Sequence, residues 1–254
     1  MRFVPAAALV VAAVTALAGG SAAPPRSIPH VVAARRVTSS ERIGTSVQGR
    51  PIGMTTIGVA AAARTALVIG CIHGDECAGR AIVARLAHAD PATFPHTRLL
   101  LVGDLNPDGF AHRTRQNAHG VDLNRNGAVG RRYLGPRGTR FYAGQAAFSE
   151  PESRAIRAVI LRERPTIVVW YHQPLTLIDA PERGSDARAR RYARMTGLPF
   201  RPLAQYPGSL SRWTNVRVRR GSSFVVELGP GRLSAALVRR HAGAVLDLVR
   251  RLRR

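Results

Sequence analysis

The stretch ALVIGCIHGDEC, residues 66–77, joins a run of apolar residues to a cluster of metal-binding side chains. Residues 66–69 are short, apolar and followed by Gly70, which is typical of a strand buried on both faces of a sheet. Five potential ligands then stand within seven positions: Cys71, His73, Asp75, Glu76 and Cys77. The stretch can be a zinc site, a disulfide-tied turn or a solvated helix start, and the rest of the chain must distinguish these.

Similar apolar runs alternate with helical patterns along the chain. We expect strands at residues 52–59, 66–69, 99–102, 166–170 and 224–226. We expect helices at residues 76–89, at residues 151–164 with Ser149 as the cap, and between Leu233 and Leu252. This alternation predicts an α/β fold with helices on both faces of one sheet.

Length and charge limit the class of protein. A chain of 254 residues with 45% hydrophobic residues can build one sizeable core, so we expect one domain. We also expect a monomer. The formal net charge is +23, and all 38 basic residues are Arg. This reflects either a coding bias or an anionic partner such as a cell-wall polymer. Aromatic residues are not interleaved with the basic ones, so we expect no nucleic-acid partner.

The N-terminus has the pattern of a secretory signal. Arg2 precedes an apolar stretch, and small residues follow at positions 21–23, so we expect a signal peptide at residues 1–23. A Pro-, Ser- and Arg-rich arm at residues 24–40 then leads to a domain at residues 41–254. An uncleaved anchor is the alternative; cleavage would leave a secreted, cell-envelope protein without a membrane span. Export favours a disulfide between Cys71 and Cys77 over two free thiols.

A catalytic zinc needs three protein ligands and one open position. His73 and Glu76 are three residues apart, and within the first turn of a helix their side chains would share one side. His172 is the preferred third ligand because it ends an apolar strand. His112 and His119 are alternatives in a Gly- and Asn-rich loop, and a lone His at a strand end is more often structural.

Three further segments carry polar residues. Asn106 to Gly109, NPDG, is a strong turn sequence. Arg115, Asn124 and Arg125 can clamp a carboxylate and polarise a carbonyl, although in so Arg-rich a chain they can also be a solvated loop. Glu227 lies in an apolar strand, where a carboxylate is costly unless it is paired or acts as a base.

Taken in order, these motifs resemble the zinc carboxypeptidase family, which includes pancreatic carboxypeptidase A and the bacterial murein peptide amidases. The similar segments are residues 46–52, 73–76, 106–109, 115–117, 120–126, 171–174 and 224–229. The resemblance implies a mixed, mostly parallel eight-stranded twisted sheet. It also implies one Zn²⁺ ion on His73, Glu76 and His172, Arg115 as the carbonyl-polarising residue, Asn124 and Arg125 on the substrate carboxylate, and Glu227 as the general base.

From this resemblance we expect a secreted zinc carboxypeptidase that cleaves a peptide, with murein peptides ending in diaminopimelate as candidates. Tyr206 matches the family's mobile substrate-binding Tyr only by its distance from Glu227. Arg212 falls where the side-chain pocket is usually lined, and Gly127 replaces a common aromatic residue. The alternatives are an N-acyl amino acid deacylase of the aspartoacylase or succinylglutamate desuccinylase type, and a catalytically silent wall-binding module.

Overall fold

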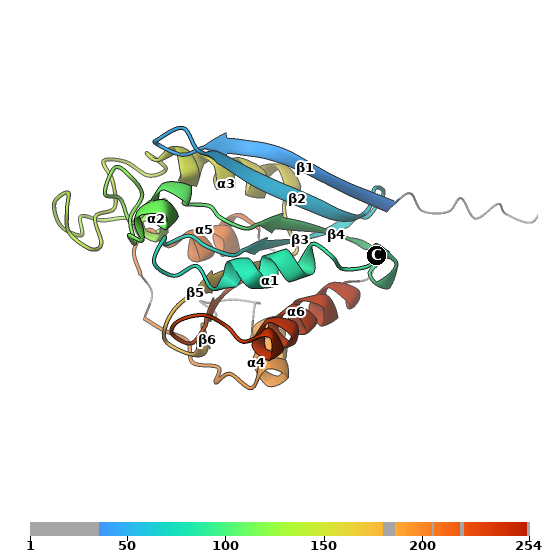
Figure 1. Cartoon of the computed structure of the whole chain (residues 1–254). Coiled ribbons are helices and arrows are strands. Elements are labelled where there is room, and N and C mark those ends of the chain that lie inside the picture. The colour runs from blue at the N-terminus through green and yellow to red at the C-terminus, as the bar shows by residue number, and fades with distance from the viewer. Residues whose placement is uncertain (1–35, 180–185, 205, 219–220, 253–254) are drawn as a thin grey trace, which may run out of the picture. The chain divides into compact units, whose positions relative to one another are not determined.

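The computed structural model describes residues 36–179, 186–204, 206–218 and 221–252, all within one unit of the chain. Seven strands form a single sheet in the order β1-β2-β4-β3-β5-β7-β6 (Figure 1). The strands are β1 (Arg36–Thr45), β2 (Pro51–Val59), β3 (Arg64–Ile69), β4 (Thr97–Val102), β5 (Ile167–His172), β6 (Leu177–Asp179) and β7 (Ser222–Glu227). The described residues thus give seven strands and not the expected eight, with the three-residue β6 at one edge of the sheet and β1 at the other.

The four central strands β4, β3, β5 and β7 are parallel to their neighbours, whereas β1, β2 and β6 pair antiparallel. Successive residues of a strand point to opposite faces. In β3, Ala66 and Val68 join the core under α1, α4 and α6, whereas Leu67 and Ile69 join the core under α3 and α5. The sheet is therefore covered on both faces, which explains why its central strands read as continuous apolar runs.

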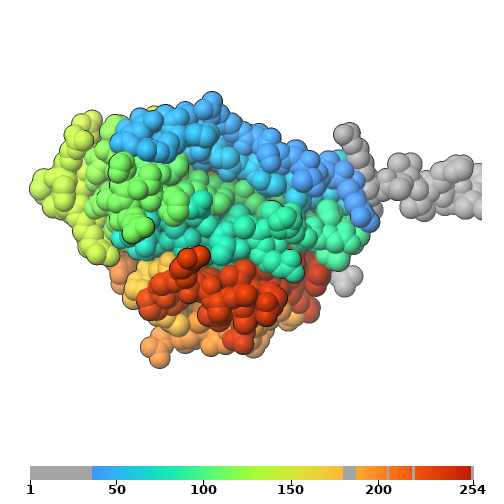
Figure 2. Space-filling view, viewed as in Figure 1, coloured from blue at the N-terminus to red at the C-terminus, as the bar shows by residue number. Residues whose placement is uncertain are grey.

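The helices are α1 (Gly79–Leu86), α2 (Pro107–His112), α3 (Pro151–Glu163), α4 (Asp186–Thr196), α5 (Leu210–Arg217) and α6 (Ala235–Arg250), with short 3₁₀ turns η1 (Pro91–Thr93) and η2 (Leu123–Arg125). On the face shown in Figure 2, α1 and α6 lie side by side and pack against each other. None of the described helices combines the length and apolar character needed to cross a membrane.

Three local expectations were wrong. The NPDG segment does not simply reverse the chain, because the Asn106 side chain accepts a hydrogen bond from the Gly109 N–H and Pro107 then opens α2. Helix α3 is preceded by Glu150 at the N-cap position and not by Ser149, whose hydroxyl instead donates to the Glu150 carboxylate. Helix α1 spans Gly79–Leu86 and not the expected residues 76–89, so Glu76 precedes the helix.

The boundary of the N-terminal arm also differs from the expectation. Residues 36–40, which we placed in the arm, belong to β1 and pair with residues 55–59 of β2. The predicted signal peptide, and the arm up to residue 35, lie outside the described residues.

The parallel strands deliver their polar residues to one edge of the sheet. Strand β3 leads into His73, β5 ends at His172, and β7 ends at Glu227. His172 and Glu227 are direct partners in the β5–β7 register. In open α/β sheets the carboxyl ends of parallel strands are where ligands bind, so this edge is the candidate site.

Candidate metal centre and active site

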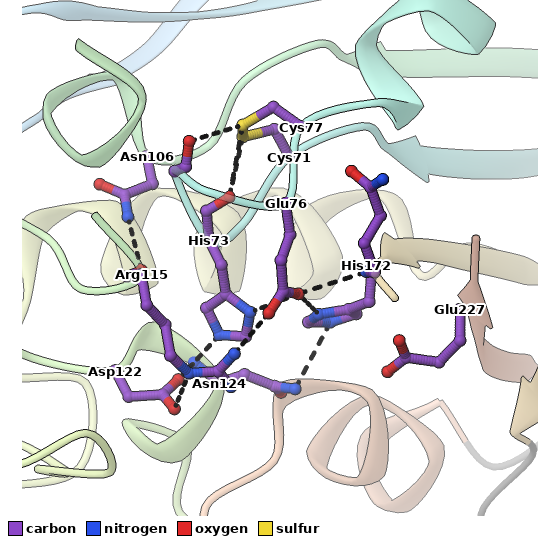
Figure 3. Close-up of polar contacts among 12 residues, drawn as sticks. Cys71, His73, Glu76, Cys77, Asn106, Arg115, Asp122, Asn124, His172 and Glu227 are labelled. Carbon is purple, nitrogen blue, oxygen red and sulfur yellow. Dashed lines mark hydrogen bonds and ion pairs between the residues drawn. A yellow bond between two sulfur atoms is a disulfide. The ribbon is translucent and has the colours of Figure 1, made fainter. Parts of the chain in front are cut away.

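The structure brings His73, Glu76 and His172 together at the carboxyl edge of the sheet (Figure 3). Their ligand atoms all lie within 4.8 Å of one another, and all three residues are buried. Glu76 Oε2 lies 3.0 Å from Nδ1 of His73 and 2.9 Å from Nδ1 of His172. Two imidazole nitrogens and one carboxylate oxygen therefore point at a common position.

A turn, and not a helix, sets the spacing of the first two ligands. The Glu76 N–H donates to the His73 carbonyl at 3.0 Å, which places both side chains on the same side. The loop is packed closely against its neighbours: a Cβ on Gly74 would lie 1.9 Å from the backbone of Gly109 in α2, and one on Gly79 would lie 2.4 Å from Tyr171. Glycine is therefore required at both positions for the loop to adopt this path.

Asp122 fixes the orientation of His73 from behind. Its Oδ1 lies 2.9 Å from His73 Nε2 and also accepts a hydrogen bond from the Asn124 N–H at 2.9 Å. Because an ionised carboxylate only accepts, Nε2 must donate to Asp122, so Nδ1, which faces Glu76, is the nitrogen that would bind a metal once its own proton is lost. The same aspartate thus caps η2 and selects the histidine tautomer.

Arg115 links Asp122 to Glu76. Its Nε donates to Asp122 Oδ2 at 3.0 Å, and its Nη1 donates to Glu76 Oε1 at 2.6 Å. Burial alone would raise the pKa of both acids, but the hydrogen bonds from His172 and His73 lower the pKa of Glu76 and the neighbouring His73 and Arg115 charges lower that of Asp122. Both carboxylates are therefore ionised at neutral pH.

Gln173 fastens the segments around the site. Its Oε1 accepts from the Ala78 N–H at 3.0 Å, and its Nε2 donates to the carbonyls of Gly229 and Gly231 at 2.7 and 2.9 Å. It therefore joins the end of β5 both to the start of α1 and to the loop that follows Glu227.

A disulfide joins Cys71 and Cys77, as expected from the sequence (Figure 3). It closes the loop that carries His73 and Glu76. No zinc ligand is taken from these sulfurs, because the ligand set within the described residues consists of His73, Glu76 and His172. Asp75, the other potential ligand in this stretch, is exposed in the turn before α1 and outside the ligand set.

A cavity of about 190 Å³ opens beside Glu76 and His172. It is lined by all the remaining residues for which we expected a role in catalysis or substrate binding: Arg115, Asn124, Arg125, Tyr206, Arg212 and Glu227. The Arg125 guanidinium lies 4.5 Å from the ring centre of Tyr206 and 5.2 Å from that of Phe141. Only 5% of Arg125 is exposed, and no carboxylate lies within 4.0 Å of it among the described residues.

Glu227 comes from the end of β7, and its side chain extends toward the His172 side of the cluster (Figure 3). It is half-buried and not fully buried, because it faces the cavity. Its one hydrogen bond from the described residues comes from the Leu175 N–H at 3.4 Å. Its carboxylate is thus held at the cavity edge without being neutralised by a described cation.

The two alternative histidines lie elsewhere. His112 Nε2 lies 3.2 Å from the Gln48 side chain at an exposed position, and His119 Nδ1 lies 2.7 Å from Glu150. Neither belongs to the group that could hold a metal among the described residues.

Three residues of the site carried no role in our sequence analysis: Asp122, Gln173 and Asp179. Asp122 and Gln173 lie inside segments that resemble the family, but the sequence alone did not indicate which residues they contact. Asp179, which also lines the cavity, follows an apolar pair in β6 with no motif around it.

The donor set fits zinc. Two histidine nitrogens and one glutamate oxygen are the protein ligands of a catalytic zinc site with an open position, and the carboxylate contact to His73 Nε2 is the usual support for such a ligand.

Comparison with known proteins agrees with this geometry. The family model for zinc carboxypeptidases matches residues 31–181 of the chain. Murein peptide amidase A of Vibrio campbellii is 31% identical over 236 residues, covering 87% of this chain and 92% of the relative.

Two solved structures show the same fold. The murein-tripeptide amidase of Escherichia coli O157 superposes with a TM-score of 0.68 at 27% identity, covering 85% of this chain and 93% of that one. Bovine thrombin-activatable fibrinolysis inhibitor, solved with a tick carboxypeptidase inhibitor, gives a TM-score of 0.71 at 19% identity, covering 84% and 88%.

Proposed function

This chain belongs to the zinc carboxypeptidase family, and from that membership we propose that it hydrolyses murein peptides at a bond next to a C-terminal carboxylate. As a member of the family it is a hydrolytic metallopeptidase. The similarity to two murein peptide amidases supports the choice of substrate.

The proposal rests chiefly on Arg125, which is buried without a carboxylate partner among the described residues. A buried guanidinium is costly unless an anion meets it. Arg125 is 5% exposed, its Nη1 donates only to the Asn124 carbonyl, at 2.9 Å, and no described carboxylate pairs with it. A carboxylate at the end of a peptide would supply the missing partner in the fork geometry that arginine favours.

His73, Glu76 and His172 would hold one zinc ion through Nδ1, Oε2 and Nδ1. When bound, zinc supplies Lewis acidity and lowers the pKa of water. The disulfide, the turn hydrogen bond and Asp122 hold these donors in place, so little reorganisation is needed when the ion binds.

Glu227 is the proposed general base. It lies beside His172 in the sheet register and faces the cavity, so its carboxylate can take a proton from water and later return it to the departing amine. Its few contacts within the described residues suit a group that must exchange a proton.

Arg115 is proposed to stabilise the negative charge that develops on the scissile carbonyl oxygen. Its Nε is held by Asp122, and the rest of the guanidinium reaches the cavity beside Glu76. Asn124 is proposed to assist Arg125: its Oδ1 accepts from the Leu210 N–H at 3.0 Å, which directs the amide group toward the cavity and His172.

We also propose that the protein is exported. The signal-like pattern of residues 1–23 supports a protein that acts outside the cytoplasm, where murein peptides occur and the disulfide is stable. N-terminal sequencing of protein recovered from outside the cell tests this part, and an intact Met1 would contradict cleavage.

The enzymatic proposal is tested with purified protein that contains zinc. We expect it to release the C-terminal residue of a murein tripeptide, read by mass, and to lose this activity when a chelator removes zinc. N-acyl amino acids are the matched comparison, because a deacylase would cleave these and leave the peptide intact. Cleavage of neither class by zinc-loaded protein would support the silent binding module instead.

A further inference from the structure

Helix α6, which lies on the face shown in Figure 2, carries a row of exposed arginines. Arg239, Arg240 and Arg250 are exposed, and none of them forms an ion pair with a carboxylate among the described residues. An α-helix rises about 1.5 Å per residue, so this row extends over about 16 Å. The chemistry proposed at the carboxyl edge of the sheet uses none of these residues.

The one acidic residue of α6 already has partners. Asp247 accepts hydrogen bonds from Nε and Nη2 of Arg191 in α4 and from Nε of Arg251 at 3.1 Å. It therefore joins α4 to α6 and is not available to neutralise the row. Arg194 follows Arg191 by three residues, so it lies on the same side of α4. It is exposed and adds a fourth cation without a carboxylate partner in the described part of the chain.

Gly243 leaves a gap in the middle of the row. It follows Arg239 and Arg240 by four and three residues and precedes Asp247 by four, so these residues share one side of the helix. A Cβ on Gly243 would meet nothing within 4 Å, so no packing contact within the described structure requires glycine. Glycine inside a helix lowers stability relative to alanine, but it allows a ligand to come close to the backbone.

We propose that this face of α6 and α4 binds a linear anionic polymer whose phosphodiester groups follow the row of arginines. The planar guanidinium group binds phosphate through two parallel hydrogen bonds. The gap at Gly243 admits a single narrow chain, whereas a flat bilayer would rest on the arginine side chains and gain nothing from the gap. A phosphodiester polymer of the cell wall has this chemistry and occurs where we propose that the protein acts.

The inference goes beyond the proposed hydrolysis and does not depend on it. The competing explanation is that these arginines are only the solvated surface of an arginine-rich chain. Such a surface would attract polyanions through total charge alone. Removing arginines from any face would then weaken binding equally, and filling the gap at Gly243 without changing the charge would have no effect.

The experiment measures binding of poly(glycerol phosphate) to the zinc-loaded whole chain by calorimetry. Raising the salt concentration from about 50 to about 200 mM should weaken wild-type binding at least about tenfold. Arg239→Gln/Arg240→Gln/Arg250→Gln should weaken it at least about tenfold at low salt, because phosphate contacts are lost. Gly243→Gln adds no charge but fills the gap, and should also cost at least about tenfold, equivalent to one lost charge-assisted hydrogen bond.

Matched controls come from the face covered by α3 and α5. Arg157→Gln/Arg164→Gln/Arg217→Gln removes the same charge from exposed positions, and Ala158→Gln adds the same side chain to the exposed surface of α3. Both controls should keep the wild-type affinity. An equal loss in the control triple variant, or an unchanged affinity in Gly243→Gln, would overturn the inference.

Two further ligands distinguish other sources of phosphate: phosphatidylglycerol vesicles and a single-stranded oligonucleotide of matched charge. Tighter binding of either one than of poly(glycerol phosphate), or no binding of the polymer by wild type, would overturn the inference. The variants should hydrolyse a murein tripeptide at the wild-type rate, because none of the changed residues lines the catalytic cavity. Polymer binding by a wild type that cleaves no peptide would contradict the hydrolase proposal and leave this inference supported.

Discussion

The polar groups that support the metal ligands are paired with one another, whereas two charged groups of the cavity are not paired. In the supporting set, Asp122 contacts both His73 and Arg115, and Arg115 reaches Glu76. Among the described residues that line the cavity, Arg125 and Asp179 have no partner of opposite charge.

The two sets of charged groups therefore have different functions. Paired buried charges fix geometry, because moving one would leave the others uncompensated. Unpaired buried charges are costly in the free protein and are compensated only when a ligand arrives. The paired network should therefore control metal binding, and the cavity charges should control which substrate is cleaved.

Removing a ligand should have the largest effect. His172→Ala deletes one of the three donors, so we expect the zinc content of the purified protein to fall to a small fraction of one per chain. Peptide hydrolysis should fall by a factor of at least about 10³, because the metal contributes several kcal/mol of transition-state stabilisation. Metal analysis and rate measurements check this. His119→Ala, which removes a histidine outside the cluster, should change neither; a similar zinc loss in that control would contradict the ligand set.

Arg125→Met should have the next largest effect. Loss of a buried partner for the substrate carboxylate should lower kcat/KM about a hundredfold for peptides with a free C-terminus. Zinc content should stay at the wild-type level, because Arg125 does not contact the ligands. Peptides with an amidated C-terminus provide the comparison. If Arg125→Met slows the free and amidated peptides equally, Arg125 does not bind the carboxylate.

Asp122→Asn should weaken zinc binding about 10–100-fold, since it removes the charge that holds His73 in the metal-binding tautomer. Competition with a chelator of known affinity measures this directly. Activity should return at high zinc concentration. Unchanged zinc affinity together with a permanent loss of activity would assign Asp122 a role through Arg115 instead.

Removing the disulfide should have the smallest of these effects. The Cys71→Ser/Cys77→Ser double variant opens a short loop, with a sequence separation of 6, and should lower the free energy of unfolding by about 2 kcal/mol. Denaturant titration with and without reductant checks this. The free energy of unfolding of wild type in reductant should match that of the double variant in oxidising buffer. A reduced wild type as stable as the oxidised protein would contradict a stabilising role of the disulfide.

Much of this fold could be predicted because its central strands are buried on both faces. A continuous apolar run such as residues 66–69 is compatible with few structures other than a buried strand. The polar residues that follow several of these runs indicated a site at one edge of the sheet. The position of His172 at the end of an apolar strand favoured it among the histidines, the resemblance to the family agreed, and the structure brings His172 to His73 and Glu76.

What the sequence did not predict depends on contacts between distant segments. The edge strand β1 has a weak apolar pattern because none of its residues is fully buried, and β6 is buried but only three residues long. The NPDG turn became a helix start through a side-chain cap, and the first two ligands lie in a turn whose path depends on close backbone packing. Asp122 and Asp179 acquire their significance only from neighbours about 50 and 24 residues away.

Whether Glu227 acts as the general base beside a bound zinc ion is tested with Glu227→Gln, prepared with zinc and assayed on a murein tripeptide beside wild type. Glutamine keeps the size of the side chain but cannot take a proton, so we expect full zinc content and a loss in kcat of about 10²–10⁴-fold. A protein with full zinc content that cleaves the peptide at the wild-type rate would contradict the account.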